Sequence, residues 1–419
     1  MDVGTGISTK GSLNLQAGND FNAKAAAVQS KDDLNVTAGG NINITAGRST
    51  ANAVDDRKDV GKSGGGNTQI TYTHENNAIG SSFSGKNVSL TTGKNANVVS
   101  SNVTFDGAVK ITATENVKIT GSEETVSSLN TYDSKKSGMF GSERKKVYDA
   151  DTAVLQASAT ISGGSVEMHA GGNLNIESQQ DSQKYDEKYT SGGLNVNINY
   201  ATGAGISGGA SSGTTKSDYN SVTDQSGIYA GEGGFNITVD KNTDLKGGVI
   251  DSDATPDKNK LTTGTLTWED VDNKAEYSSK DVGINVNINN GAKDNEKGVT
   301  PNIGMPAKGE DESTTKAGVA QGTIEIKDKE NQKQNIEDLN RDTKNTLNKL
   351  EQIFDKQTVA ERKEMAALFG ELAYNVVHNI DGTPEQKAAL HALVGGIMGE
   401  LTGSGFLAGA SGAAVNKLL

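Results

Sequence analysis

The side chains best suited to catalysis or metal binding are few and scattered along the chain. There are four histidines, no cysteine and one tryptophan among 419 residues. Only His378 and His391 lie near each other, and a zinc site would need further ligands at defined spacing. The lack of cysteine also excludes disulfides and thiolate metal sites. We therefore interpret the two histidines as ordinary residues of packed helices, and we predict no metal and no cofactor.

One acidic pair and one basic cluster could form other kinds of site. Asp251-Ser252-Asp253 lacks the glycine-rich tandem of a calcium-binding β-roll and the glutamate of an EF-hand loop. We expect a corner there, in which the Asp side chains bond to the backbone. Arg144-Lys145-Lys146 is the strongest basic cluster, but the net charge of −13 repels nucleic acid. We interpret the cluster as a solvated loop and predict no nucleic-acid partner.

Five glycines near the C-terminus recur with a spacing of four residues. They are Gly395, Gly399 and Gly403, followed by Gly405 and Gly409. Small residues four apart let helices approach closely, and in lipid this drives helix association. A membrane span needs about 20 apolar residues, and Glu400 interrupts the run. Two interpretations remain open: a tightly packed helical hairpin, or a hairpin that inserts into a membrane when a toxin crosses it.

The elements that would carry these residues are short repeated strands. In the segment Leu34–Gly47, apolar residues alternate with Asn or Thr, and glycine ends each run. Alternation with a period of two places the apolar side chains on one face of a strand. Leu13–Gly18 is an earlier copy at an offset of 21 residues, and Val88 and Val109 repeat the same spacing. Copies that bury their apolar rows by stacking predict a solenoid, specifically a right-handed parallel β-helix over residues 1–290.

Two long polar stretches interrupt the repeats, near residues 48–84 and 121–150, and we interpret them as excursions from the coil. A longer repeat also appears, because Leu194–Asn199 recurs as Ile284–Asn289 after 90 residues. These two segments could be hairpin arms or coils of the solenoid, and the sequence does not separate the alternatives.

The pattern changes after the repeats. Residues 291–322 contain Gly, Lys, Asp and two prolines without an apolar period, which predicts a linker. Apolar residues then recur at helical spacings from Ile336 to Phe354. Thr358 with Glu361 predicts a second helix start, and Thr383-Pro384 predicts a third. We therefore expect a small α-helical domain over residues 323–419.

Several segments together resemble one family of secreted proteins. The repeats of Leu34–Gly47 are similar to the haemagglutinin repeats of filamentous-haemagglutinin-like exoproteins, as are two later segments. Those segments are Gly247–Ala254 and Asn259–Leu266. The C-terminal part resembles the pre-toxin region of contact-dependent growth inhibition (CdiA-type) effectors. The segments that carry this likeness are Leu368–Asn375, Ala389–Met398 and Gly403–Ala410.

The resemblance implies a secreted, cell-surface protein that is delivered to a target cell. In that family a two-partner outer-membrane transporter exports the protein, one region binds a receptor, and a second repeat region engages the target-cell outer membrane. We expect contact with the transporter only through a missing N-terminus, and with an immunity protein only through a missing toxin. No secretion signal precedes the repeats, and no Val-Glu-Asn-Asn boundary or toxin follows, so the resemblance implies the delivery machinery.

The predicted function is therefore non-enzymatic: the delivery and scaffold portion of a contact-dependent growth inhibition toxin, with a toxin domain expected beyond Leu419. A haemagglutinin-type adhesin without a toxin is the alternative. A third possibility is a glycan-active β-helix enzyme, which would need a carboxylate pair or a basic residue facing a groove. The acidic residues show no repeated pair at one coil position, which disfavours that possibility.

Overall fold

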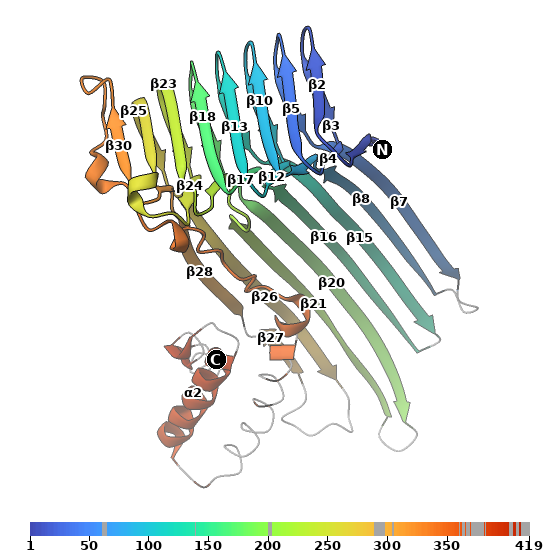
Figure 1. The fold of residues 1–419 in the computed structure, drawn as a ribbon. Helices are drawn as coiled ribbons and strands as arrows, with labels where there is room; N and C mark the ends of the chain where they lie inside the picture. The colour runs from blue at the N-terminus through green and yellow to red at the C-terminus, as the bar shows by residue number, and fades with distance from the viewer. Residues whose placement is uncertain are drawn as a thin grey trace.

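The computed structural model describes residues 1–419 except 61–64, 139, 200–202, 289–297, 304–305, 360, 363–364, 366–368, 370–380, 382, 402–404, 408–409 and 412–419. The described strands form three sheets, of eight, thirteen and nine strands. The first two sheets are parallel and wind into a solenoid, whereas the third is antiparallel and leaves the coil stack as one broad sheet (Figure 1). The predicted parallel β-helix is confirmed.

Each coil contributes one strand to the eight-stranded sheet, and most coils contribute two to the thirteen-stranded sheet. The eight-stranded sheet holds β1 (Gly6–Thr9), β4 (Ala27–Ser30), β9 (Ser82–Gly85), β12 (Asn102–Phe105), β17 (Thr160–Gly163), β22 (Gly227–Ala230), β24 (Val249–Ser252) and β29 (Gly318–Val319). The thirteen-stranded sheet holds β2 (Leu13–Ala17), β3 (Phe21–Lys24), β5 (Asp33–Ala38), β6 (Ile42–Thr45), β10 (Asn87–Thr92), β11 (Ala96–Val99), β13 (Ala108–Ala113), β14 (Val117–Thr120), β18 (Ser165–Ala170), β19 (Leu174–Glu177), β23 (Phe235–Lys246), β25 (Lys260–Glu269) and β30 (Thr323–Ile326).

The core is a column of apolar side chains that runs along the inside of the coils. Leu13 pairs with Leu34, Leu34 with Val88, and Val88 with Val109. Leu34 and Ile42 are 0% and 1% exposed and belong to the same buried cluster. Because burial of each such side chain contributes roughly 1.5–3 kcal/mol, the stack is the main source of stability. The predicted offset of 21 residues is confirmed for β2 with β5 and for β10 with β13, whereas β22 with β24 and β23 with β25 are offset by 22 and by 23–24 residues.

Asparagine side chains link the coils on the outside of the solenoid. The amide Nδ2 of Asn35 donates to Oδ1 of Asn14 at 2.8 Å, and Asn43 donates to Asn22 at 2.7 Å. The next coil extends the second ladder, since Asn97 donates to Asn43 at 2.8 Å. These ladders use the polar face that the alternating sequence leaves outside.

The two predicted excursions are ordered β-hairpins. They are formed by β7 (Gly47–Val60) with β8 (Gly66–Ile79), and by β15 (Ser122–Gly138) with β16 (Gly141–Ala157). Strand β8 also pairs with β15, so hairpins from different coils join into the antiparallel sheet. The strand pattern was missed because these arms are mostly polar, and their apolar alternation is brief, as in Ile70 and Tyr72 of β8.

Two further sets of long strands complete the antiparallel sheet. They are β20 (Asp181–Asn199), β21 (Gly203–Ser221), β26 (Val271–Ile288), β27 (Gly298–Ile303) and β28 (Ala307–Thr315). The repeated segments Leu194–Asn199 and Ile284–Asn289 therefore fall in hairpin arms, as far as the structure describes them, and not in coils.

The predicted linker over residues 291–322 is wrong where the structure describes that range. Strands β27 and β28 both pair with β26, and β29 adds to the eight-stranded sheet. Pro301 lies in β27 and pairs with Ile284. Proline is compatible with an outer strand such as β27, because it has no N–H to donate to a further neighbour.

The segment from 327 to 347 closes the end of the solenoid instead of forming the helix that we predicted there. It contains only short 3-10 turns, η3 (Ile336–Asp338) and η4 (Thr343–Asn345). The backbone N–H and C=O of Leu266 each bond to the side-chain amide of Gln332 at 2.8 Å, and Trp268 bonds to Gln334 in the same way at 2.9 Å. The two glutamines thus replace a neighbouring strand. We call residues 327–347 the cap.

The described helices follow the cap. Residues 356–359 are helical, and the carboxylate of Asp355 accepts from the N–H of Thr358 at 2.6 Å, so this helix starts before the predicted Thr358. Helix α2 (Pro384–Leu401) starts as predicted, with a reciprocal capping pair between Thr383 and Gln386. A short 3-10 turn, η1 (Pro256–Lys258), precedes β25.

Candidate functional site: the far ends of the hairpin sheet

The predicted glycine site lies partly on α2. Gly395 and Gly399 are within the helix, whereas Gly403 and Gly409 lie outside the described residues. Gly405 has a φ of +87°, and its N–H donates to the carbonyl of Gly399 at 3.2 Å. The structure therefore brings Gly399 and Gly405 together at the end of the helix.

One glycine of α2 that the sequence analysis did not single out packs against an aromatic ring. A Cβ added to Gly396 would lie 2.4 Å from the ring of Phe406, so the ring packs directly on the helix backbone. The carboxylate of Glu400 accepts from the N–H of Phe406 at 2.7 Å, which holds the turn in place. The adjacent pair Gly395-Gly396 was the available sequence signal.

The apolar side chains of α2 are only partly buried. Leu390, Val394 and Leu401 pack together with Met398, but Leu393 is 48% exposed. Among the described residues, no helix combines the length and the apolarity that are needed to cross a membrane.

The most unusual exposed surface lies at the far ends of β20, β21 and β26. Large apolar side chains there are 43–62% exposed, although most residues of that kind are buried elsewhere in the solenoid. They are Leu194, Ile198, Ile206, Val282, Ile284 and Ile288. We call this set the tip face.

Register and alternation place all six residues on one side of the sheet. Ile206 pairs with both Val196 and Ile288, and residues opposite one another in an antiparallel sheet point to the same face. Ile284 pairs with Ala210, four residues beyond Ile206 on the same strand. The intervening positions face the other way and are polar, as Asn195 and Ser207 show. The far end of this sheet is therefore amphipathic.

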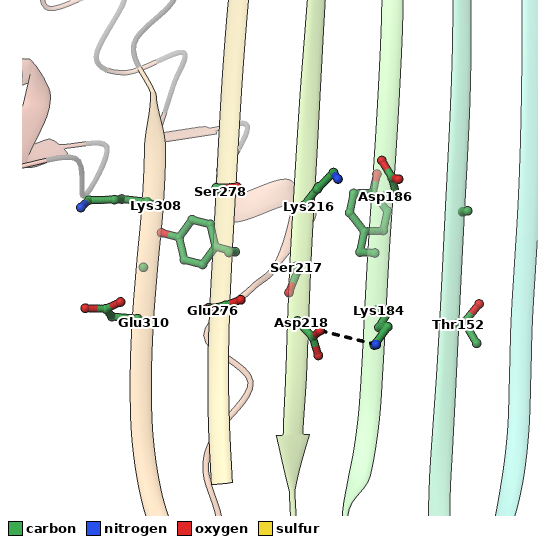
Figure 2. A pocket seen from close by; sticks show the side chains of 14 residues that line it. Thr152, Lys184, Asp186, Lys216, Ser217, Asp218, Glu276, Ser278, Lys308 and Glu310 are labelled. Carbon is green, nitrogen blue, oxygen red and sulfur yellow. Dashed lines mark ion pairs between the residues drawn. The ribbon is translucent and has the colours of Figure 1, made fainter.

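The same side of the sheet is charged closer to the solenoid. A shallow hollow of about 760 Å³ crosses β16, β20, β21, β26 and β28, and Figure 2 shows its lining of lysines and carboxylates. Lys184 pairs with Asp218 at 3.7 Å across two neighbouring strands. Exposed pairs of this kind contribute little stability but keep that part of the surface hydrated. The face thus changes from charged to apolar along the strands.

The opposite side of the sheet carries a row of tyrosines. Tyr185, Tyr219 and Tyr277 are each 6% exposed, because residues 348–359, which we call the strap, lie across them. The ring of Phe354 lies 5.0 Å from Tyr185 and 5.8 Å from Tyr277, centroid to centroid. Burial raises the pKa of the Tyr185 phenol, and the hydrogen bond that it donates to Glu187 raises it further.

The charged motifs of the sequence analysis have local partners. Asp251 accepts from the hydroxyl of Thr343 at 2.6 Å and pairs with Lys344 at 2.8 Å, so cap side chains bind it and not the backbone that we expected. Arg144 forms a bidentate pair with Asp133 at 3.0 and 2.7 Å on a hairpin arm. In the part of the chain that the structure describes, no group of three or more His, Asp or Glu is arranged to hold a metal ion.

The remaining histidines have ordinary surroundings. His74 bonds to Asn52 at 2.6 Å and His169 lies 3.4 Å from Asp240, and both histidine side chains are exposed. His378 lies outside the described residues, so the predicted role of the pair His378 and His391 stays a prediction.

Comparison with known proteins agrees with this architecture. Residues 2–62 and 147–193 match the family described as "Hemagglutinin repeat". The chain is 35% identical over 385 residues to "tRNA nuclease CdiA" of Escherichia coli O6:K15:H31, which covers 90% of the chain and 11% of that protein. It is 38% identical over 248 residues to "Toxin CdiA" of Yersinia pestis, covering 58% of the chain and 7% of that protein.

A third relative gives the same result. The chain is 38% identical over 240 residues to "Deoxyribonuclease CdiA" of Yersinia pseudotuberculosis serotype O:3, covering 56% of the chain and 22% of that protein. The chain thus spans between 7% and 22% of the length of these relatives, and no solved structure matches it. We conclude that the chain is a haemagglutinin-repeat segment of the CdiA type.

Proposed function

We propose that this chain is the delivery and scaffold portion of a contact-dependent growth inhibition toxin, and that it contacts the outer membrane of the target cell through the tip face. The observation that carries the proposal is the amphipathic far end of the hairpin sheet, with six large apolar side chains exposed on one side. The similarity to CdiA toxins over nine tenths of the chain supports the scaffold role.

Physical chemistry favours a lipid partner for this surface. The tip face spans about 20 Å along β26, from Val282 to Ile288, at roughly 3.3 Å per residue. Burial of a Leu, Ile or Val side chain in an apolar medium contributes roughly 1.5–3 kcal/mol, and somewhat less for one that is already partly covered. The charged hollow lies closer to the solenoid and would stay in water. The sheet therefore has the polarity gradient of an element that dips into a bilayer end first.

The wider biological setting belongs to the same proposal. We propose that a longer protein is exported by a two-partner outer-membrane transporter and displayed at the cell surface. Its contact with the transporter, and the toxin domain that an immunity protein would bind, belong to parts outside these 419 residues. For the glycines of α2 we propose a helix-packing role, supported by the contact between Gly396 and Phe406. Insertion of this region during toxin entry is the alternative, and Gly399→Leu tests it, because that variant should then abolish entry but not cell binding.

Vesicle flotation tests the lipid contact. The chain is mixed with vesicles of phospholipid and lipopolysaccharide, and the bound fraction is measured for Ile198→Asp/Ile288→Asp. We expect at least tenfold weaker binding, since two apolar contacts are lost and two charges must be desolvated. Val54→Asp/Val60→Asp is the control, because these valines are 65% and 78% exposed on the same side of another hairpin. Equal binding of both double variants would contradict the proposal.

A further inference from the structure

We infer that the strap, residues 348–359, is a releasable clasp that holds the C-terminal helical region against the hairpin sheet and can open while the solenoid stays folded. Its resting place is the tyrosine row formed by Tyr185, Tyr219 and Tyr277. The opening of the strap does not depend on the proposed delivery function. Only the role that we give this opening in delivery rests on that proposal.

The chain before the strap is fixed firmly to the solenoid. Arg341 donates to the carbonyl oxygens of Val319 at 2.9 Å, Ala320 at 2.8 Å and Gly322 at 3.0 Å. The cap also bonds directly to the backbone of β25 through its two glutamines. Loss of these contacts would expose the end of the apolar column, so the cap stays in place when the strap opens.

The hinge is Asn348, where the chain leaves the cap. Asn348 has a φ of +42°, in the left-handed region that L side chains rarely adopt. Its side-chain amide donates to the carbonyl of Thr314 at 3.0 Å, and its own carbonyl accepts from the hydroxyl of Ser313. A strained, non-glycine conformation that is held by side-chain bonds is typical of positions where a segment can swing.

The strap is attached mainly through side chains. Between Glu351 and Asp355 it has no regular secondary structure. Two hydrogen bonds fix its start, from the hydroxyl of Tyr219 to the carbonyl of Leu350 at 2.9 Å, and from the N–H of Leu350 to the hydroxyl of Ser221 at 2.9 Å. Beyond Leu350, apolar and aromatic contacts take over.

A charged clamp holds the other end of the strap. The ammonium of Lys356 contacts the carboxylates of Asp149 and Glu187, the second at 3.1 Å, and lies 5.3 Å from the centre of the Tyr185 ring. The two carboxylates come from neighbouring strands, β16 and β20. Lys356 keeps 53% of its side chain exposed, and Asp149 and Glu187 keep 17% and 19%, so release returns all three charges to water.

The sheet beneath the strap is complete without it. Strands β20, β21, β26 and β28 pair with one another along their lengths, so their ladder hydrogen bonds survive the release. Release uncovers tyrosine side chains, two carboxylates and a small apolar set that includes Leu350, Phe354 and Val359. This set is far smaller than the apolar column of the solenoid, which keeps all its contacts. Opening the strap therefore requires much less free energy than unfolding the solenoid core.

Thiol labelling in the native state tests this difference directly, because the chain has no cysteine of its own. Val359→Cys reports on the strap, since Val359 is 5% exposed beside Tyr277 and Ala307, and Ala113→Cys reports on the core, at 0% exposed. We expect Cys at position 359 to react at least 100-fold faster than Cys at position 113 without denaturant. Labelling of both thiols at the same rate, with the same urea dependence, would overturn the inference.

Variants of the clamp provide a second readout. Asp149→Asn/Glu187→Gln should accelerate labelling at position 359 about tenfold and leave labelling at position 113 unchanged. Asp133→Asn is the matched control, because Asp133 pairs with Arg144 on the same hairpin but away from the strap. An unchanged rate at position 359, or an equal acceleration at both positions, would show that the clamp does not hold a separate clasp.

A cross-link separates this inference from the proposed function. In the full-length toxin, Ala307→Cys/Val359→Cys is locked with a short bismaleimide, and vesicle binding and toxin transfer are measured. We expect normal binding with at least tenfold less transfer. Normal transfer with the strap locked would exclude a role for its release in delivery, whereas loss of vesicle binding by the tip-face variant concerns only the lipid proposal.

Discussion

Single glycines decide whether consecutive coils can stack. A Cβ on Gly39 would lie 2.2 Å from the carbonyl oxygen of Gly18 in the coil beside it, and Gly93 meets Gly39 in the same way. The glycines that end each repeat are therefore required by close contact between backbones, and not only by the turn itself. This is why the sequence repeats glycine at a fixed place in the coil.

Gly39→Ala tests this contact. We expect the variant to lose about 2–3 kcal/mol, because the methyl group can be accommodated only by moving backbone. Gly18→Ala is the control, since a Cβ at that position meets nothing within 4 Å. The urea midpoint of both variants, followed by circular dichroism, gives the comparison. A shift of the urea midpoint of the same size in both variants would show that the close backbone contact at Gly39 is not the cause.

A partly buried phenol, that of Tyr229, predicts how stability changes at alkaline pH. Burial, followed by the charges of Asp251 and Asp224, raises the pKa of Tyr229 to about 12 from its ordinary value of 10.0. The unfolded chain therefore loses this proton before the folded chain does. Stability is complete below pH 10 and falls by up to about 2.7 kcal/mol between pH 10 and 12.

Tyr229→Phe removes that contribution. The variant should lose less stability than the wild type between pH 9.5 and 11.5, as measured by the urea midpoint at each pH. Other tyrosines and lysines titrate equally in both proteins, so the difference belongs to Tyr229. An identical pH dependence in the two proteins would contradict this origin.

At the scale of elements, the cap shows how the solenoid ends without an exposed edge. Strand β30 covers the first half of β25, and Gln332 and Gln334 cover the second half with side-chain amides. An uncovered strand edge would be free to pair with other chains. The cap therefore acts against end-to-end association as well as adding stability.

Gln332→Leu/Gln334→Leu tests the cap. The variant leaves four backbone groups of β25 without their partners, at roughly 1 kcal/mol each, so we expect a loss of about 2–4 kcal/mol. We also expect concentration-dependent oligomers in analytical ultracentrifugation. Gln321→Leu, at an exposed position just before β30, should leave both measurements unchanged.

The coils of the solenoid could be predicted from the sequence, but several later strands and the cap could not. The coils were predictable because their signal is local: Leu34–Gly47 alternates with a period of two and pairs with a copy 21 residues away. The strands after residue 297 were missed because their partners are distant, as in the pairing of Ala307–Thr315 with β26. The apolar spacing from Ile336 to Phe354 looked helical, but Leu339 packs on the solenoid core and Leu350 on the tyrosine row.

The tip face was visible in the sequence only as a repeat. Leu194–Asn199 and Ile284–Asn289 both alternate apolar residues with asparagine, which shows that each arm has one apolar side. Whether that side is buried depends on what packs against it, and no local pattern encodes this. For the predicted glycines near the C-terminus, the spacing of four residues predicts close packing. It does not identify the residue that packs against them.

At the scale of the whole molecule, the solenoid and the hairpin sheet have different roles. The solenoid is closed around its apolar column and capped at one end, which makes it a rigid support. The hairpins leave it as one continuous sheet (Figure 1). The inner part of this sheet is charged, and its far end is apolar. The scaffold thus presents the tip face at a fixed distance from the coils.

The most direct test is to observe the tip face at a membrane. A polarity-sensitive fluorophore is attached to Ile288→Cys and, as a reference, to Val54→Cys, and emission is recorded with vesicles of phospholipid and lipopolysaccharide. Both positions are exposed in the free protein, at 61% and 65%. We predict a blue shift at position 288 and none at position 54; emission at position 288 that stays as in water while the protein is bound would contradict the account.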